Sequence, residues 1–418
     1  MLGKSDELIM MQQWYQAVHG KRRLGGNTSR NPAYKFDYFV NAPLIGDLIG
    51  LMNADREWIA PEVAAHWAEI AARNRAIAGP VLDLLGVRYV TLCVDKAPDA
   101  LVRFVDEVLP VTLVDEWQGP DWKGAASTIR LYRVNPPPDA DEWQIDLAQP
   151  VGNLYLAEGW MPMGYKGVRY AVRQNVELLL DLPDAGGQLE MELLGSAANV
   201  EIGLAGQRIG QTTLIDMRTP QVVTLEIPPQ LATAVVDRLE LRFNQAIPIS
   251  EIQPDTPSLL AYSAGEEMGK SARIFVNGRN VVRDERGYNL AASGTDGVVL
   301  ESVAFDTNAP PAAVEGATAS QQMAKWLTKW PEGTVIAGAV RDEASAQLGQ
   351  EAVDALAHLG VATDLRGKFR WGHAFIATVG GSAVEAASLL QPAIVAVGLP
   401  ANGEFVSGGV GKVQFRSR

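Results

Sequence analysis

The amino-acid sequence predicts a multidomain protein in which an α/β unit is followed by an antiparallel, jelly-roll-like β-sandwich and then by an α+β sandwich. Its 418 residues exceed the length of one ordinary domain. The spacing of apolar residues changes from helical to alternating near residue 140 and becomes mixed again near residue 270. We therefore expect an α/β domain at 1–135, a β-sandwich at 140–252, an α+β domain at 271–400 and a tail at 401–418.

The first domain is predicted from helices and strands that alternate along the chain. One helix is expected to open near Pro61 and to end at Gly79-Pro80, because proline is tolerated in the first turn of a helix but not later. Asp99 is placed as the N-cap of a second, amphipathic helix. Strands are expected at 87–94, 111–114 and 128–134.

A stiff, polar spacer is expected to separate the first two domains, because Pro136, Pro137 and Pro138 are followed by acidic residues. Beyond it, short alternating runs are bounded by turn residues, which is typical of an antiparallel sandwich. Trp160 and Tyr165 either offer an aromatic platform to a sugar or seal one end of this sandwich. The alternating runs lie at 176–182, 189–194, 200–204, 222–227 and 239–243.

The third domain is expected to begin after a second linker, at 253–270. Apolar residues alternate over 272–276, just before Asn277-Gly278, which is a strong hairpin signal. Gly360 is placed where a left-handed residue would end a helix. Strands are expected at 286–292, 298–307, 333–340 and 371–379, and helices at 323–330 and from Gln350 onward.

Composition and charge narrow the function classes. The formal net charge of −13 repels phosphate backbones and anionic lipids, so nucleic acid is not an expected partner. The single cysteine, Cys93, excludes internal disulfides and a cysteine zinc cluster, and its apolar neighbours predict a buried thiol. The basic residues Lys412, Arg416 and Arg418 are too sparse to reverse the charge, and they predict a solvated terminus.

Four ordered elements in the last third of the chain carry a family resemblance. They are Arg286-Gly287 before a strand, Gly333-Thr334-Val335 with Asp342-Glu343 at the two ends of the next strand, Leu359-Gly360 at the end of a helix, and Phe369-Arg370 before a final strand. In this order they resemble the interleukin-like EMT inducer domain. That family includes secreted cytokine-like proteins and the stem domain of the glycosyltransferase that adds N-acetylglucosamine to O-linked mannose.

The stem-domain resemblance implies lectin-like binding of a glycan by Arg286, Asp342 and Arg370. A carboxylate accepts hydrogen bonds from sugar hydroxyls, and a guanidinium donates to sugar oxygens. The alternative is structural, with Asp342 capping a turn and Arg370 pairing with it to join two strands. The chain departs from the family pattern at Trp371 and His373, where an Asp and a Trp are expected, so the sugar preference does not transfer.

The beginning of the chain resembles a different group of proteins. Tyr15-Gln16, Val18-His19-Gly20-Lys21, Gly25-Gly26 and Ser29-Arg30 are similar to a segment that follows the membrane-spanning part of bacterial multi-spanning glycosyltransferase-like proteins, and 85–92 supports this similarity. The resemblance implies attachment to an upstream membrane-spanning region and a periplasmic or extracellular location. The sequence itself has no apolar run long enough to cross a membrane, and we expect it to be a fragment.

No catalytic constellation stands out in the sequence. We find no order of Ser, His and Asp, no paired carboxylates and no metal-ligand spacing that points to an enzyme, and we expect no cofactor. The leading hypothesis is a non-catalytic, extracytoplasmic carbohydrate-binding module. Two alternatives remain open: an acceptor-binding region of a membrane glycosyltransferase, and a structural or protein-binding scaffold.

Overall fold

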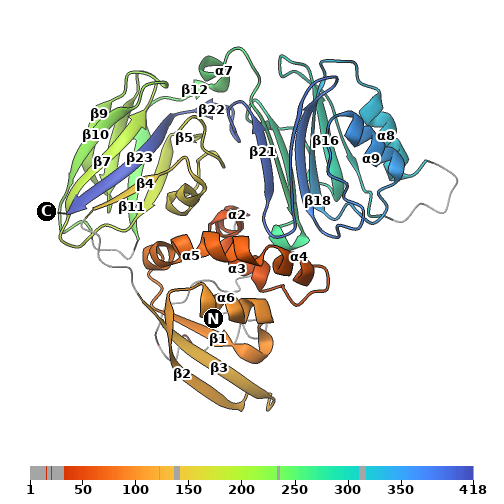
Figure 1. Ribbon diagram of the computed structural model, residues 1–418. Helices are drawn as coiled ribbons and strands as arrows, with labels where there is room; N and C mark the ends of the chain where they lie inside the picture. Colours follow the sequence, from red (N-terminus) through yellow and green to blue (C-terminus); the bar gives the residue numbers. More distant parts are fainter. Residues whose placement is uncertain are drawn as a thin grey trace. The chain divides into compact units, whose positions relative to one another are not determined.

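The protein is β-rich and is built from several sheets (Figure 1). The computed structural model describes residues 16, 20, 33–121, 123–135, 142–232, 236–309 and 317–417. Two of the stretches singled out in the sequence lie outside these residues. One is the segment 11–32 that carries the N-terminal resemblance, of which only Gln16 and Gly20 are described, and the other is the proline spacer at 136–141. The chain divides into two compact units, Met1–Asp141 with Ala234–Val236 and Glu142–Thr233 with Asp237–Arg418.

The helices of the first unit correct one prediction. The described helices that open it are α2 (Ala33–Asn41), α3 (Ile45–Leu51), α4 (Ala60–Ala65) and α5 (Trp67–Leu84). The expected end at Gly79-Pro80 is wrong, because α5 continues through Pro80 to Leu84. A proline inside a helix costs about 3 kcal/mol. Val81, Leu82 and Leu84 are buried beyond it, and burying such side chains contributes about 1.5–3 kcal/mol each.

A three-stranded antiparallel sheet completes the first unit, in the order β1 (Tyr89–Cys93), β3 (Ala126–Val134), β2 (Val111–Pro120). Cys93 is 1% exposed, which confirms the predicted buried thiol. After η1 (Val94–Lys96), helix α6 (Asp99–Glu107) follows, with Pro98 rather than Asp99 at its N-cap. The apolar face of α6 buries Leu101, Phe104 and Val105, as its helical spacing predicts.

A β-sandwich opens the second unit, and its two sheets share one apolar core. The first sheet has the order β10 (Gln221–Ile227), β7 (Gly187–Leu194), β23 (Gly408–Ser417) and β4 (Glu142–Asp146), with β5 (Arg169–Ala171) also paired to β23. The second has the order β6 (Asn175–Leu180), β11 (Asp237–Phe243), β8 (Asn199–Leu204) and β9 (Gln207–Thr213). All five alternating runs of the sequence are therefore strands.

Alternation along these strands decides which side chains enter the core. Leu189, Met191 and Leu193 of β7 are buried, whereas the residues between them are partly exposed. Trp160 comes from the segment after η2 (Pro150–Tyr155) and is only 6% exposed. Its indole N–H donates to the carbonyl oxygen of Glu177 at 3.1 Å. Trp160 therefore seals the sandwich and presents no platform to a ligand.

The end of the chain is part of this sandwich. β23 pairs with β4, β5 and β7 (Figure 1). Its side chains Val410, Val413 and Phe415 are fully buried. Phe415 stacks on Trp143 of β4 with ring centroids 5.6 Å apart. The prediction of a solvated tail at 401–418 is therefore wrong for residues 408–417.

The strand order makes the C-terminal sheet an insertion between β11 and β23. Where the chain leaves the sandwich, β12 (Ile247–Pro248) precedes α7 (Ile249–Ile252), and where it returns, β22 (Phe405–Val406) pairs with β12. Ile249 and Val406 are buried there with Leu399 and Ala401 in one apolar cluster. Whether sandwich and insertion are separate domains, as the sequence suggests, stays a prediction.

The inserted sheet contains the family-like strands and helices. Its first strand, β13, corrects the predicted linker at 253–270, because every residue of Leu259–Gly265 is buried. Asn277 and Gly278 both have positive φ and form the predicted hairpin turn. The strands are β13, β14 (Ser271–Val276), β15 (Arg279–Asn280), β16 (Gly287–Ser293), β17 (Val299–Phe305), β18 (Val335–Asp342), β19 (Gly372–Thr378), β20 (Ala383–Ser388) and β21 (Ala393–Val397), with η3 (Glu266–Met268), α8 (Ala319–Thr328) and α9 (Gln350–His358).

This nine-stranded sheet has two parts. One part has the order β17-β16-β18-β19-β20, and the other has the order β21-β13-β14-β15. Ile336 and Val340 of β18 share a core with α8 and α9, while Ala337 and Ala339 share another core with β13, β14 and β21. Alternation therefore buries both faces of β18. The two parts join where Ala264 and Gly265 pair in parallel with Arg341 and Asp342.

We expect Phe415→Ala to lower the free energy of unfolding by about 3–5 kcal/mol, because it leaves a cavity in a fully buried site. Urea unfolding followed by tryptophan fluorescence measures this, with Trp143 beside the mutated ring as a probe. Lys412→Ala, an exposed position on the same strand, is the control. Equal losses in the two variants would show that β23 does not belong to the core.

Candidate functional site

The three candidate residues lie at one end of the nine-stranded sheet. Arg286 directly precedes β16, Asp342 ends β18, and Arg370 lies two residues before β19. Because β18 is antiparallel to both β16 and β19, its end lies beside the beginnings of these two strands. Gly287 is paired with Arg341, so Arg286 and Asp342 are neighbours across the two strands.

Arg370 forms ion pairs with the short acidic turn η3. Its Nη2 lies 2.8 Å from Glu266 Oε2, and its Nη1 lies 3.0 Å from Glu267 Oε1. The side chain of Arg370 is 23% exposed, whereas that of Glu267 is 2% exposed. The guanidinium therefore neutralises a buried carboxylate at its inner end and reaches solvent at its outer edge.

The backbone of Arg370 is held as closely as its side chain. Its φ of 62° is left-handed, which is uncommon for a residue other than glycine. Its N–H donates to the carboxylate of Glu343, which is buried and also accepts from the N–H and hydroxyl of Ser345. A Cβ at Gly265 would lie 1.9 Å from the Arg370 carbonyl oxygen, so this approach requires glycine.

Glu266 links Arg370 to Asp342. Burial raises the pKa of Asp342, and a hydrogen bond to Glu266 raises it further. Burial alone would raise the pKa of Glu266 too, but hydrogen bonds from Lys270 and Asp342 and the charge of Arg370 outweigh it and lower this pKa. Of the two, Asp342 is therefore the carboxyl group that takes up a proton first as the pH falls, and the proton can then be donated to Glu266. The ammonium of Lys270 lies 2.8 Å from Glu266 Oε1 and 4.0 Å from Asp342 Oδ2.

Arg286 is already engaged by a different carboxylate. Its Nε and Nη2 donate to Asp306, which follows β17, at 2.7–3.2 Å. The hydrogen bonds and charge of Asp306 raise the pKa of Arg286. The charge of Asp342 raises it further, by a smaller amount. The side chain of Arg286 is 44% exposed. The structure therefore brings Asp342 and Arg370 into one charged cluster and leaves Arg286 at its edge.

Sequence reasoning missed part of this cluster. Glu266, Glu267 and Lys270 fell within the predicted linker, so they were not considered as site residues. A signal was present in the sequence, because Glu266 and Glu267 follow the mostly apolar run 259–264 after a single glycine, Gly265. Polar side chains that follow a buried strand lie at a sheet edge, where sites are commonly built. The structural alternative supposed a pair of Asp342 with Arg370. Arg370 forms its ion pairs with Glu266 and Glu267, and its charge makes only a smaller contribution at Asp342, where it lowers the pKa.

A second set of missed residues forms a hydrogen-bonded chain inside the same domain. His373 is fully buried, and its Nδ1 lies 3.1 Å from the Tyr288 hydroxyl. Its Nε2 lies 3.1 Å from Glu385 Oε2. Glu385 also accepts from the N–H groups of Ala362 and Thr363, at 2.8 and 3.2 Å. His373, one of the departures from the family pattern, thus anchors the segment that leads to Arg370.

Protonation along this chain follows from burial. Burial lowers the pKa of His373, so its imidazole is neutral at pH 7. Burial likewise raises the pKa of the Tyr288 hydroxyl, which keeps it protonated. The hydrogen bond from His373 lowers the pKa of Glu385 to about 2, with help from the two backbone donors. We therefore assign the tautomer in which Nε2–H donates to Glu385 and Nδ1 accepts from Tyr288.

Two comparisons bear on what this domain is. Residues 286–381 match the model of the family described as interleukin-like EMT inducer, and this range includes Arg286, Asp342 and Arg370. The match confirms the resemblance of the C-terminal domain. Comparison with curated proteins found no match.

Among solved structures, one similar chain is the β-glucuronidase of Bifidobacterium dentium complexed with coumarin-3-O-glucuronide. The two chains are 9% identical, with a TM-score of 0.10, and the alignment covers 72% of this chain. It covers 48% of the enzyme, so the chain spans about half the length of that protein. At this TM-score the likeness supports no argument about fold or activity.

Two further properties hold for the part of the chain that the structure describes. There, no group of three or more His, Cys, Asp or Glu side chains is arranged to hold a metal ion. Within the same residues, no helix combines the length and the apolar character needed to cross a bilayer.

We expect the free energy of unfolding of this domain to fall as the pH is lowered from about 6.5 to about 2. His373 contributes stability above its unfolded pKa of 6.5, and Glu385 contributes above 4.5; acidification removes both contributions, because both folded pKa values are lowered. The share of Glu385 is at most about 3 kcal/mol.

Urea unfolding at a series of pH values measures this dependence. Glu385→Gln removes the titrating group and should flatten the curve between pH 4.5 and 2, while Glu332→Gln, an exposed position, should leave it as in the wild type. Parallel curves for the wild type and Glu385→Gln would contradict the role given to Glu385.

Proposed function

From the family match of residues 286–381 and the position of Asp342 beside Glu266 and Arg370, we propose that this protein is a non-catalytic carbohydrate-binding module. The support comes mainly from one observation. Strand ends from three parts of the sequence bring carboxylates and a guanidinium together where each is partly accessible: 20% of the Asp342 side chain and 23% of that of Arg370 are exposed.

Such a cluster suits hydroxyl groups. A carboxylate oxygen accepts from a sugar O–H, and a guanidinium donates to hydroxyl, ring or acetamide oxygens in a fixed planar geometry. Charge-assisted hydrogen bonds of this kind are stronger than neutral ones. Ordering a flexible sugar offsets much of this gain, so we expect dissociation constants on the order of millimolar to micromolar.

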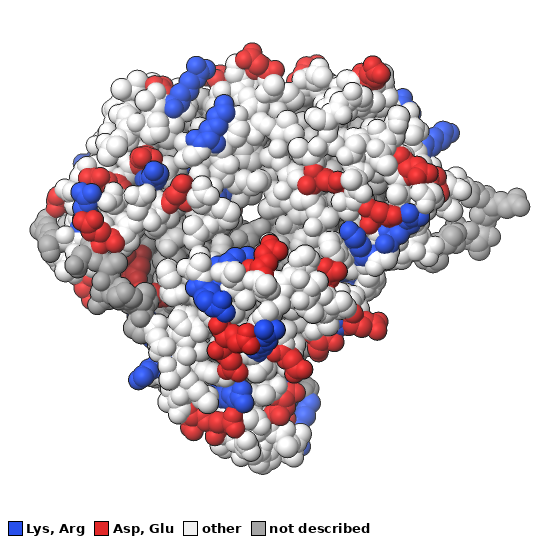
Figure 2. Space-filling model, viewed as in Figure 1, with Lys and Arg blue, Asp and Glu red and all other residues white. Residues whose placement is uncertain are grey.

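Charge argues for a neutral ligand. Glu266, Glu267 and Asp342 are balanced in part by Lys270 and Arg370, which leaves no excess of positive charge to hold an anionic sugar. Over the described residues on the face drawn in Figure 2, acidic and basic side chains are interspersed and form no continuous basic field. The formal charge of −13 adds a general repulsion of anions.

The setting that we propose is the extracytoplasmic face of a membrane, as the soluble part of a cell-envelope glycan protein. This rests on the N-terminal resemblance to membrane glycosyltransferase-like proteins. An alternative within the same setting is that the chain positions the acceptor of such a glycosyltransferase. The upstream sequence separates the two, because many membrane spans with an acidic loop between them would favour the enzyme.

A scaffold is the remaining alternative, and the cluster itself favours it in one respect. Removing one partner of a buried ion pair costs about 3–5 kcal/mol. Arg370 faces Glu267, which is almost fully buried. The same ion pairs could therefore serve only to hold β13, β18 and β19 together, and the test has to distinguish stability from binding.

Asp342→Asn makes this distinction. Asparagine keeps the shape and can donate to Glu266, so we expect the melting temperature to change little, while the negative charge that strengthens the hydrogen bond accepted from the sugar is lost. On a glycan array, the wild type should bind a neutral glycan and Asp342→Asn should lose most of that signal. Arg370→Lys keeps the charge but not the planar fork, and should also weaken binding.

Asp364→Asn, in an exposed ion pair of the same domain, is the matched control for both measurements. A wild type without any array signal would contradict glycan binding. Large losses in melting temperature with unchanged binding would instead assign Asp342 and Arg370 to the scaffold.

We also expect no turnover of sugars by the purified chain, because its two carboxyl groups that could act as acid and base, Asp342 and Glu266, are hydrogen-bonded to each other, and Glu266 is also paired with Lys270 and Arg370. Release of nitrophenol from a panel of 4-nitrophenyl glycosides, and hydrolysis of nucleotide sugars, measure this. Turnover that disappears in a single-residue variant would overturn the assignment as a non-enzyme.

A further inference from the structure

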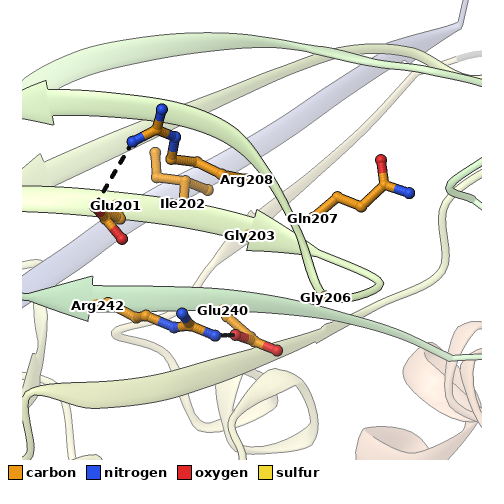
Figure 3. Close-up of a pocket in the computed structure, with 8 residues that line it drawn as sticks. All are labelled: Glu201, Ile202, Gly203, Gly206, Gln207, Arg208, Glu240 and Arg242. Atoms are coloured by element: carbon orange, nitrogen blue, oxygen red, sulfur yellow. Dashed lines mark hydrogen bonds and ion pairs between the residues drawn. The ribbon is translucent and has the colours of Figure 1, made fainter.

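A small hollow opens on the outer face of the four-stranded sheet of the sandwich (Figure 3). It has a volume of about 30 Å³ and lies between β8, β9 and β11. Val200, Ile202 and Leu204 of β8 point into the sandwich and are fully buried. The residues between them, Glu201 and Gly203, therefore face outward, and both line the hollow.

The missing side chain at Gly203 creates this space. Gly203 is flanked by Glu240 on β11 and by Arg208 on β9, and the pairing of β8 with β9 shifts by one residue next to it. The nearest atoms to a Cβ at this position would be the Gln207 carbonyl oxygen at 3.5 Å and Glu240 at 3.6 Å, which are ordinary contacts. The fold does not require glycine here. Glycine in a strand often marks a place where a ligand approaches closely.

The lining contains as many negatively charged acceptors as positively charged donors. Glu201 lies 3.8 Å from the guanidinium of Arg208, and Glu240 forms an ion pair with Arg242. The two carboxylates and two guanidinium groups sum to zero charge, so the hollow favours neither an anion nor a cation. Gln207, whose amide can both donate and accept, belongs to the same lining.

Size and chemistry together define a ligand group. A volume of about 30 Å³ exceeds the roughly 10–15 Å³ that one water requires, but it is far too small for a sugar ring. A hydroxyl or hydroxymethyl group fits, since it can donate to a carboxylate and accept from a guanidinium at once. The ring that carries it would lie over the polar outer face, where Arg238 and Glu177 form another ion pair at 2.9 Å.

We propose that this hollow is a second carbohydrate site, which takes a hydroxyl or hydroxymethyl group of a neutral glycan and acts independently of Asp342 and Arg370. Exposed hydrogen bonds to one group support only weak binding, with a dissociation constant on the order of millimolar. One chain with two such sites would bind a polymeric glycan more tightly than either site alone.

Saturation-transfer difference NMR on the full chain tests the site, with cellotriose, maltotriose and mannotriose as probes. The background is Asp342→Asn, which disables the first site. At least one trisaccharide should retain a signal in this background. Adding Gly203→Ala should reduce that signal at least tenfold, because the methyl group fills the hollow without displacing its neighbours.

Arg416→Gln, an exposed position on the other sheet of the sandwich, is the control and should leave the signal unchanged. Glu240→Gln is the second test variant, since it keeps the shape but replaces the charged acceptor with a weaker, neutral amide oxygen; it should also weaken the signal. Absence of any signal in the Asp342→Asn background would overturn the proposal. A signal that neither Gly203→Ala nor Glu240→Gln reduces would also overturn it. Melting curves of both variants serve to check that they are folded.

Discussion

The two parts of the nine-stranded sheet depend on a short parallel pairing, in which Ala264 and Gly265 of β13 lie beside Arg341 and Asp342 of β18. Parallel pairing over two residues is weak by itself. The Ser263 side chain reinforces this pairing with two hydrogen bonds. Its hydroxyl donates to the Val340 carbonyl at 2.5 Å and accepts from the His373 N–H at 2.8 Å. The cluster around Glu266 lies directly beyond this junction. The geometry of the candidate site is therefore inseparable from the joining of the sheet.

Strands with one buried face were predictable from the sequence, and strands without alternation were not. β6, β7, β8 and β11 each bury every second residue, β10 does so only at Leu225 and Ile227, and all five strands were predicted. β13 is buried on both faces, so its run of apolar and small residues shows no period and was assigned to a linker. β23 carries Gly408, Gly409 and Gly411, which obscure its buried side chains. Its partners β4 and β7 lie more than two hundred residues earlier.

The candidate site was predictable to the extent that it depends on neighbouring strands. Asp342 and Arg370 flank strands that pair with each other, so their proximity follows from local order. Glu266 and Lys270 enter through the pairing of β13 with β18, which no local pattern indicates. The chain from Tyr288 through His373 to Glu385 likewise depends on three strands meeting in space. A histidine in a buried strand was visible in the sequence, but its partners were not.

The place of β23 has a consequence for the order in which the protein can mature during synthesis. The sheet that holds β4 and β7 lacks the strand between them until residues 408–417 have been made, about 165 residues after Phe243. At ~5–20 residues per second, this interval is on the order of 10–30 seconds. The inserted sheet, whose strands are contiguous from 259 to 397, can fold during that time, while the sandwich waits with two unpaired edges that are open to other chains. Slow translation of residues 244–407, or a premature stop before residue 408, would leave this sheet incomplete, so the maturation of the sandwich depends on the strand formed by residues 408–417.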